Sequence, residues 1–287
     1  MTSITSLTSA ATRFRALHDR AGCFVIPNPW DVGSARLLAS FGFEALATTS
    51  AGFAFSLGVR DGAPTREQVL EHCRSLVAAT DLPVSADLEN GFADSPEGVA
   101  ETVRLARETG LAGCSIEDYT NRREDPIYDF ALSVERVEAA VEAARSGGGD
   151  FVLTARAENL LCGRDDLDDT IRRLQAFEAA GADVLYAPGL HDIDSVRAVT
   201  SALSKPVNVV MGMPGATLEV GELAAARVKR ISLGSAFFRA ALGEFLRAVT
   251  EVQNEGRFSF AARAVGFAEI EAHFAPFEAR DQLRDGA

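Results

Sequence analysis

Short β-rich runs alternate with longer helical patterns along most of the chain, and this alternation constrains the fold more than any other feature. Amphipathic stretches such as "SPEGVAETVRLARETG" and "LDDTIRRLQAFEAAG" separate the runs, and several end in glycine, as helix C-termini prefer. The candidate strands lie at 23–30, 45–50, 83–89, 113–118, 151–158, 184–188, 206–211 and 230–234. About eight β/α units in roughly 230 residues predict an α/β fold of the (β/α)8 type, the TIM barrel.

A doubly wound open sheet is the alternative, and it is disfavoured because no GxGxxG motif follows the first candidate strand. With 287 residues, 47% of them hydrophobic, the chain can bury a large core. Since the body contains no segment with the composition of a linker, we expect a single barrel domain over residues 12–287. The Ser/Thr-rich opening "MTSITSLTSAATRFRAL" weakly resembles a transit peptide. It lacks an apolar segment, however, and we interpret residues 1–11 as a disordered tail.

From about residue 251 the chain continues as a C-terminal helical extension. Apolar side chains recur there at mostly helical spacing: Phe258, Phe260, Phe267, Ile270 and Phe274. This pattern predicts an extra helix with an apolar face, and such a face needs a partner. We therefore expect packing between subunits and a homo-oligomer.

Composition argues against several kinds of partner. A formal charge of −13 and a pI near 4.8 disfavour nucleic acid or an anionic membrane surface. The cysteines are far apart and form no CxxC pair: Cys23, Cys73, Cys114 and Cys162. That spacing fits reduced thiols in a cytoplasm rather than a disulfide framework or a zinc site. No apolar run approaches the length of a transmembrane helix.

Acidic residues fall at the ends of the candidate strands, where barrels of this kind place their catalytic groups. Asp87 and Glu89 alternate in "PVSADLE" and are expected to project from one face of their strand. Glu117 and Asp118 close the next strand, and Asp61 lies in the loop after the second one. Neighbouring carboxylates repel unless a cation lies between them, and oxygen donors without clustered His or Cys suit Mg²⁺ or Mn²⁺. Alternatively, these acids cap helices or pair with arginines.

Groups that suit an anion lie near the same strand ends. Arg156, in "TARAE", is suited to clamping a substrate carboxylate with two hydrogen bonds. Alternatively, it neutralises Glu158 or Glu117 as an ion pair within the barrel. A segment after the second strand offers hydroxyl and backbone N–H groups, unless it is an ordinary Ser/Thr-rich turn. Its residues are Thr49, Ser50 and Ala51.

Three further features are weaker candidates. His191, in "PGLHD", is interpreted as a solvated loop residue rather than an acid or base. Cys162 follows the fifth strand without a nearby His, which disfavours a nucleophile. The segment "LGSAFFRAALG" vaguely resembles a barrel phosphate site, but its apolar content favours strand-to-helix packing.

Taken in order, these motifs resemble the isocitrate lyase/phosphoenolpyruvate mutase superfamily. The resemblance runs from "NPWDVGSARLL" through "TTSAGFAFSLGVRDG", "PVSADLENGF", "GCSIED", "TARAENLL" and "AGADVLYAPG" to "PVNVV". It implies a barrel that holds Mg²⁺, binds a 2-oxo acid or its enolate, and makes or breaks a C–C or P–C bond beside the carbonyl. It also implies a homotetramer, a dimer of dimers, in which the eighth helix is exchanged between paired subunits.

The same resemblance implies roles for individual residues. Asp87 matches the direct metal ligand, and three acids match those that hold metal-bound waters: Asp61, Glu89 and Glu117. The segment Thr49, Ser50 and Ala51 matches the surroundings of the substrate carboxylate and enolate oxygen, and Arg156 matches an anion-binding arginine. Arg156, Glu117 and Asp61 are therefore the expected catalytic residues.

Three departures from the family patterns bear on the reaction. Isocitrate and methylisocitrate lyases carry a Lys-Lys/Arg-Cys-Gly-His motif after the fourth strand, whereas this loop reads "YTNRREDPIYDF" and has no cysteine. The loop is also shorter than the mutase gating loop, so Asn121 has no firm counterpart there. The sixth strand ends in Ala187-Pro188, where mutases place a histidine.

The leading hypothesis is a Mg²⁺-dependent lyase, decarboxylase or hydrolase that cleaves a C–C bond of a small 2-oxo (di)carboxylic acid through a metal-stabilised enolate. An alternative is P–C bond chemistry on phosphonopyruvate or phosphoenolpyruvate. A third hypothesis is a non-catalytic protein that binds a 2-oxo acid, because the lyase and mutase acid/base groups are missing.

Overall fold

The computed structural model describes residues 9–285. The tail expected at residues 1–11 lies mostly outside the described residues, and helix α1 (Ala10–Asp19) includes the last two residues of that tail. The Ser9 hydroxyl starts this helix by accepting a hydrogen bond from the backbone N–H of Thr12 at 3.0 Å.

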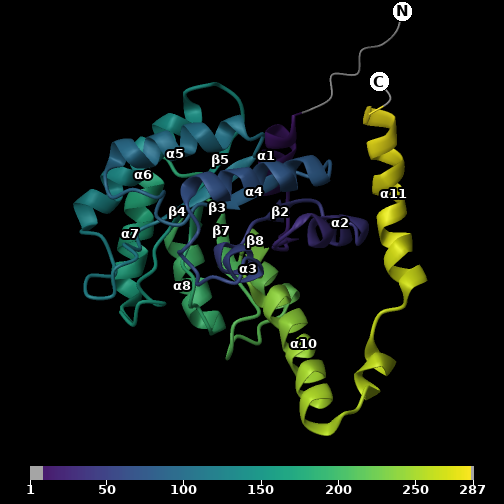
Figure 1. Ribbon diagram of the computed structural model, residues 1–287. Coiled ribbons are helices and arrows are strands. Elements are labelled where there is room, and N and C mark those ends of the chain that lie inside the picture. Colours follow the sequence, from purple (N-terminus) through teal and green to yellow (C-terminus); the bar gives the residue numbers. More distant parts are fainter. Residues whose placement is uncertain (1–8, 286–287) are drawn as a thin grey trace, which may run out of the picture.

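Eight parallel strands form a nearly closed barrel with helices around it (Figure 1). The strands are β1 (Phe24–Ile26), β2 (Leu46–Ala47), β3 (Val84–Asp87), β4 (Gly113–Glu117), β5 (Val152–Arg156), β6 (Val184–Tyr186), β7 (Val207–Val210) and β8 (Arg230–Ser232). They pair in the order β1-β8-β7-β6-β5-β4-β3-β2. Between β1 and β2, the N–H of Ala47 donates to the carbonyl of Pro27 at 3.0 Å. The predicted barrel is confirmed, and the open doubly wound sheet is wrong.

Helices connect successive strands and cover the outside of the barrel. They are α2 (Val32–Ser40), α3 (Ser50–Ser56), α4 (Arg66–Ala79), α5 (Pro96–Glu108), α6 (Phe130–Arg145), α7 (Leu167–Ala179), α8 (Ile193–Ala202), α9 (Val220–Ala225), α10 (Ala236–Glu255), the 3₁₀ helix η1 (Ser259–Arg263) and α11 (Phe267–Asp285). Helices α2 to α8 each start at a residue whose side chain accepts a hydrogen bond from a backbone N–H of the first turn. At α4, for example, Thr65 and Gln68 exchange side-chain-to-backbone hydrogen bonds.

The apolar core lies between the barrel wall and the helices. One cluster joins α4, α5 and α6 to β3, β4 and β5, and a second joins α7, α8 and α9 to β5, β6, β7 and β8. The barrel interior is polar by comparison. Arg230 is buried there and donates to the Asn208 side-chain oxygen at 2.8 Å and to the Thr154 hydroxyl at 3.0 Å. Helix α1 packs Phe14 and Leu17 against Phe24 at the start of β1.

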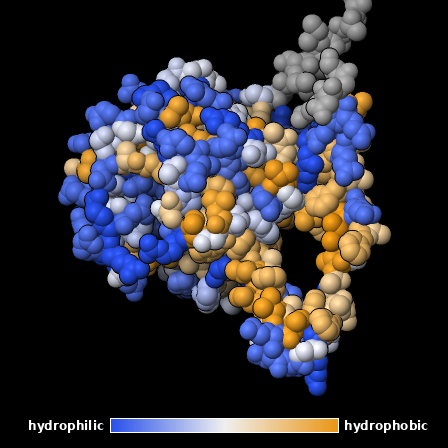
Figure 2. Space-filling view, viewed as in Figure 1, coloured by the Kyte–Doolittle hydropathy of each residue, from blue (hydrophilic) through white to orange (hydrophobic). Residues whose placement is uncertain are grey.

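The last two helices form an arm that departs from the barrel. Figure 1 shows α10 running away from the strands and α11 returning beside α2. Arg36 of α2 pairs with Asp281 of α11 at 2.5 Å. No described residue of α10 is buried, and Phe245 is 62% exposed. Figure 2 shows hydrophobic residues gathered along this arm.

The predicted C-terminal helix is confirmed as α11, although Phe258 and Phe260 lie at η1, before it begins. Over residues 9–285, no helix is both long enough and apolar enough to cross a lipid bilayer.

Candidate active site

The carboxyl ends of β3, β4 and β5 bring charged side chains together. β3 ends at Asp87, β4 at Glu117 and β5 at Arg156. Glu117 and Arg156 are direct partners in the β4–β5 register, and Asp87 is opposite Ser115 in the β3–β4 register. Because the strands are parallel and adjacent, their terminal side chains meet at one end of the barrel.

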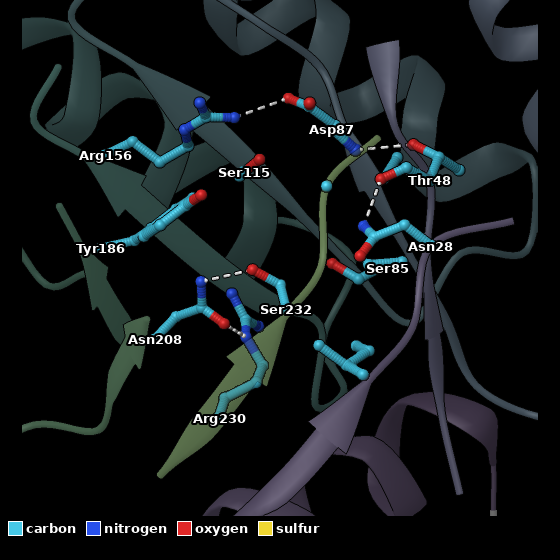
Figure 3. A pocket seen from close by; sticks show the side chains of 14 residues that line it. Asn28, Thr48, Ser85, Asp87, Ser115, Arg156, Tyr186, Asn208, Arg230 and Ser232 are labelled. Atoms are coloured by element: carbon cyan, nitrogen blue, oxygen red, sulfur yellow. Dashed lines mark hydrogen bonds and ion pairs between the residues drawn. The ribbon is translucent and has the colours of Figure 1, made fainter. Parts of the chain in front are cut away.

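Arg156 lies at the centre of this group and pairs with three carboxylates. Its Nη1 is 3.0 Å from Asp87 Oδ1, and its Nη2 is 3.1 Å from Glu117 Oε2 and 2.7 Å from Glu158 Oε1 (Figure 3 shows the Asp87 pair). The guanidinium also lies over the Tyr186 ring, 4.8 Å from its centroid. Burial alone would lower the pKa of Arg156, but the three carboxylates raise it well above its usual value. The ion pairs of Arg156 with Glu117 and Glu158, one of the two interpretations drawn from the sequence, are present in the structure.

Glu89 reaches the site by a different route from the one expected. The prediction that strand alternation places it beside Asp87 is wrong, because β3 ends at Asp87 and Glu89 has a left-handed backbone with φ of 51°. The N–H of Glu89 donates to Asp87 Oδ1 at 3.4 Å. The turn, rather than the pleat of a strand, brings these two carboxyl groups together.

Crowding of the acids changes their protonation. Burial, followed by the charges of Asp87 and Asp61, raises the pKa of Glu89 to about 8. Burial is also the main cause of the raised pKa of Glu117 and of Asp61. Glu158 brings the number of carboxyl groups around Arg156 to five. Ionising all five groups would leave an excess of negative charge beside one arginine; the raised pKa values reflect that cost, and a cation would offset it.

The donor atoms of this group fit a hard divalent cation, since they are all carboxylate oxygens. In the described part of the chain, no three His, Cys, Asp or Glu side chains already converge as a metal cage. Mg²⁺ needs no such cage, because it binds through one or two carboxylates and keeps several waters. Asp87, at the end of β3, could supply one such carboxylate.

The three residues of the predicted substrate-binding segment, Thr49, Ser50 and Ala51, differ in their position relative to the carboxylates. Thr49 caps α3, and its Oγ1 accepts a hydrogen bond from the N–H of Gly52 at 3.3 Å. The backbone N–H of Ser50 lies 3.5 Å from Asp87 Oδ2, and Ser50 lines the pocket described next. Ala51 lies in the first turn of α3 and does not line that pocket. The structure thus brings Ser50, but neither of its neighbours, to the carboxylates.

A pocket of about 900 Å³ opens above the carboxylates, and we call it the mouth pocket. Its acidic members are Asp61, Glu89, Glu117 and Glu158, and Arg156 lies among them. Loops after β2 and β4 contribute three side chains that the sequence did not single out: Arg60, Tyr119 and Arg123. The only feature of the sequence that could have identified them as pocket residues was their position in loops that follow strands. Asn121, with φ of 62°, also lines the pocket.

A second, smaller cavity of about 50 Å³ extends from Asp87 and Arg156 into the barrel interior (Figure 3). Ser85, Asn208 and Arg230 are among its lining residues. Its volume has room for a few water molecules.

The other candidates are structural or solvated. Asp118 pairs with Arg173 at 3.1 Å, away from the pocket lining. His191 is exposed. Burial, with Glu158 next, raises the pKa of Cys162 to about 11, so its thiol stays protonated at neutral pH.

The segment after β8, residues 233–243, packs on neighbouring apolar side chains, as its composition predicted. Phe238 contacts the rings of Trp30 and Phe55, with centroids 5.3 and 6.0 Å apart.

Comparison with known proteins agrees with this geometry. The family model described as phosphoenolpyruvate phosphomutase matches residues 14–253. The chain is 31% identical to an oxaloacetate decarboxylase from Paraburkholderia xenovorans (strain LB400), a match that covers 82% of this chain and 79% of that one. It is also 31% identical to the 2-methylisocitrate lyase of Escherichia coli (strain K12), over 82% and 81% of the two chains.

Among solved structures, a provisionally described lyase/mutase from Burkholderia cenocepacia J2315 is 60% identical with a TM-score of 0.90, covering 93% of this chain and 95% of that one. The family match spans most of the chain, and the barrel gathers carboxylates at the ends of β3 and β4. The protein therefore belongs to the isocitrate lyase/phosphoenolpyruvate mutase superfamily, whose members act as lyases, decarboxylases or mutases on small oxo-acids.

Proposed function

We propose that the protein cleaves a C–C bond beside the keto group of a small 2-oxo (di)carboxylic acid, as a lyase, decarboxylase or hydrolase. The observation that carries the proposal is the group of five carboxyl groups around Arg156, in which the pKa of Glu89 rises to about 8. Such a group is unfavourable by itself and suits a site that functions with a divalent cation. The relatives named above act on small oxo-acids, which is consistent with this chemistry.

We assign the cation as Mg²⁺, with Mn²⁺ as a substitute. Asp87 would hold it directly, and Asp61, Glu89 and Glu117 through water. When bound, it would supply positive charge to the keto oxygen as enolate character develops there. Arg156 binds and orients the substrate carboxylate, exchanging part of its contact with Asp87 for the ligand, and the N–H of Ser50 faces the same space.

Oxalate tests this proposal, because it is a planar dianion with two oxygens that can chelate one cation. Without a cation, oxalate would have to compete with three carboxylates for Arg156, and binding should be undetectable by calorimetry in EDTA. In excess Mg²⁺ we expect a Kd of about 1 µM, near −8 kcal/mol. Equal affinity in the two buffers would mean that the carboxylates are structural, and the proposal would be dropped.

A panel of 2-oxo acids with Mg²⁺ then distinguishes the reactions. Turnover with loss of a carbon fragment supports the proposal, whereas oxalate binding without any turnover indicates a binding protein. Release of inorganic phosphate from phosphonopyruvate would indicate P–C chemistry. The mouth pocket contains no histidine among its lining residues, which fits the C–C reaction better than the mutase pattern.

We also propose a homo-oligomer, a dimer of dimers, in which α10 packs on a second copy of the chain. Helix α10 carries apolar side chains that its own barrel leaves exposed, including Leu246 at 54% and Phe245 at 62%. Phe238 at its start contacts Phe55, which lines the mouth pocket, so a partner that packs on α10 would lie close to the site. The four cysteines are unpaired, which supports a reducing cytoplasm as the location.

A further inference from the structure

The charged side chains that line the mouth pocket differ in their exposure to solvent. Glu89, Glu117 and Glu158 form its floor near the strand ends and are each less than one-tenth exposed, whereas Asp61 is exposed on the loop after α3. Two exposed arginines stand at its rim on different loops: Arg60 between α3 and α4, and Arg123 between β4 and α6. The pocket thus offers a ligand a buried acidic floor and an exposed rim with two arginines and one acid, Asp61.

In the described part of the chain, the side chains of the two rim arginines have no polar partner. Over residues 9–285, neither side chain makes an ion pair or a hydrogen bond, although the chain has 41 acidic residues against 28 basic ones. The neighbouring Arg122 behaves differently. Its Nη1 lies 3.0 Å from both carboxylate oxygens of Asp94, and its guanidinium lies over the Tyr128 ring at 5.6 Å.

The loop that carries Arg123 has a defined shape. An isolated antiparallel bridge joins Tyr119 to Ile127, and the Thr120 hydroxyl accepts a hydrogen bond from the N–H of Arg122 at 3.0 Å. With Arg122 held toward Asp94, Arg123 falls on the pocket side, close enough to Tyr119 for its charge to oppose the burial that raises the pKa of that phenol. The loop therefore presents one arginine to the fold and the next one to the pocket.

We propose that Arg60 and Arg123 form an anion subsite that binds the carboxylate at the far end of the substrate, so that the protein selects 2-oxo dicarboxylates over 2-oxo monocarboxylates. This inference rests on the proposed function, because it assumes that the keto-acid end of the ligand lies at the floor. A second carboxylate would be repelled by the acids there and attracted to the rim. Guanidinium groups bind carboxylates with paired hydrogen bonds, which fixes the orientation of the ligand.

Oxaloacetate and 2-oxobutyrate make a matched pair of probes, since they differ by a terminal carboxylate in place of a methyl group. Oxalate serves as the short reference, because it is too short to reach from floor to rim. Apparent affinities are measured in Mg²⁺ by competition against oxalate, using early readings before oxaloacetate decays. The test variants are Arg60→Gln and Arg123→Gln. The control variant, Arg164→Gln, removes the same charge from a nearby loop position outside the pocket lining.

We expect the wild type to bind oxaloacetate more tightly than 2-oxobutyrate, and each test variant to lose about tenfold in oxaloacetate affinity, the equivalent of one charged contact. Affinity for 2-oxobutyrate and for oxalate should be unchanged in all variants, and Arg164→Gln should match the wild type. Equal wild-type affinity for the two probes, or equal losses in Arg164→Gln, would overturn the subsite. If the wild type fails to bind oxalate in Mg²⁺, the proposed function itself fails. Oxalate binding without discrimination by the rim arginines refutes this inference alone.

Discussion

The raised pKa of Glu89 can be tested without knowing the substrate, because it makes the stability of the fold depend on pH. The perturbation is Glu89→Gln, which keeps the shape of the side chain and removes its charge. A carboxyl group whose pKa is raised in the folded state stabilises the fold at low pH. That contribution is fully present below about pH 4.5 and is lost as pH rises through about 8. Metal-free wild-type protein should therefore lose stability over this window, and the variant should lose less.

The size of the effect follows from the pKa. A rise from 4.5 to about 8 has a ceiling of about 5 kcal/mol, at roughly 1.4 kcal/mol for each pH unit. Because the pocket is open to water, screening lowers this ceiling, and we expect ~2 kcal/mol. For a chain of this size that corresponds to about 5 °C in the melting temperature.

The assay is thermal unfolding in EDTA between pH 5 and pH 9 at fixed protein concentration. Added Mg²⁺ should flatten the wild-type curve, because a cation favours the ionised carboxyl group. Glu124→Gln, an exposed position on the loop after β4, is the matched control and should follow the wild type. If Glu89→Gln retains the full pH slope of the wild type, the carboxyl groups do not interact as described.

Three further predictions address the metal, the substrate and the assembly. Asp87→Ala should abolish Mg²⁺ binding and turnover, and wild-type turnover at limiting Mg²⁺ would show that Asp87 is not the direct ligand. The metal-free variant should keep its stability within about 1 kcal/mol, because Arg156 retains Glu117 and Glu158 as partners. Isocitrate and 2-methylisocitrate should be poor substrates, because the loop from Tyr119 to Phe130 has no cysteine; rapid release of glyoxylate or pyruvate from them would contradict this. Light scattering should detect an oligomer at micromolar concentration, since α10 exposes its apolar side chains; a monomer at that concentration would refute the proposed packing.

The sequence predicted the barrel because its signals are local and repeated. Each helix and strand has its own period of apolar residues, and every expected strand is present in a shorter form. The order of the motifs identified the family. The roles assigned to Asp87, Arg156 and the surrounding acids stay predictions, which the experiments above test.

Other features of the site depend on contacts that no local pattern encodes. Glu89 reaches Asp87 through a left-handed turn, whereas the sequence suggested strand alternation. Arg122 and Arg123 are identical in type and adjacent in the chain, yet only tertiary contacts with Asp94 separate the paired arginine from the one in the pocket. Loop conformation decided these positions, and one sequence carries little information about it.

The polar side chains inside the barrel can change during evolution without loss of the apolar core. Stability comes mainly from the outward side chains that pack between the wall and the helices, while Ser85, Asn208 and Ser232 face the interior cavity. Alternate residues of a strand point to opposite sides, so an inward position can change without removing a core contact. Mutational drift inside the barrel can therefore alter the chemistry beneath Asp87 and Arg156 while the fold persists, and a family built this way can acquire new reactions faster than new architectures.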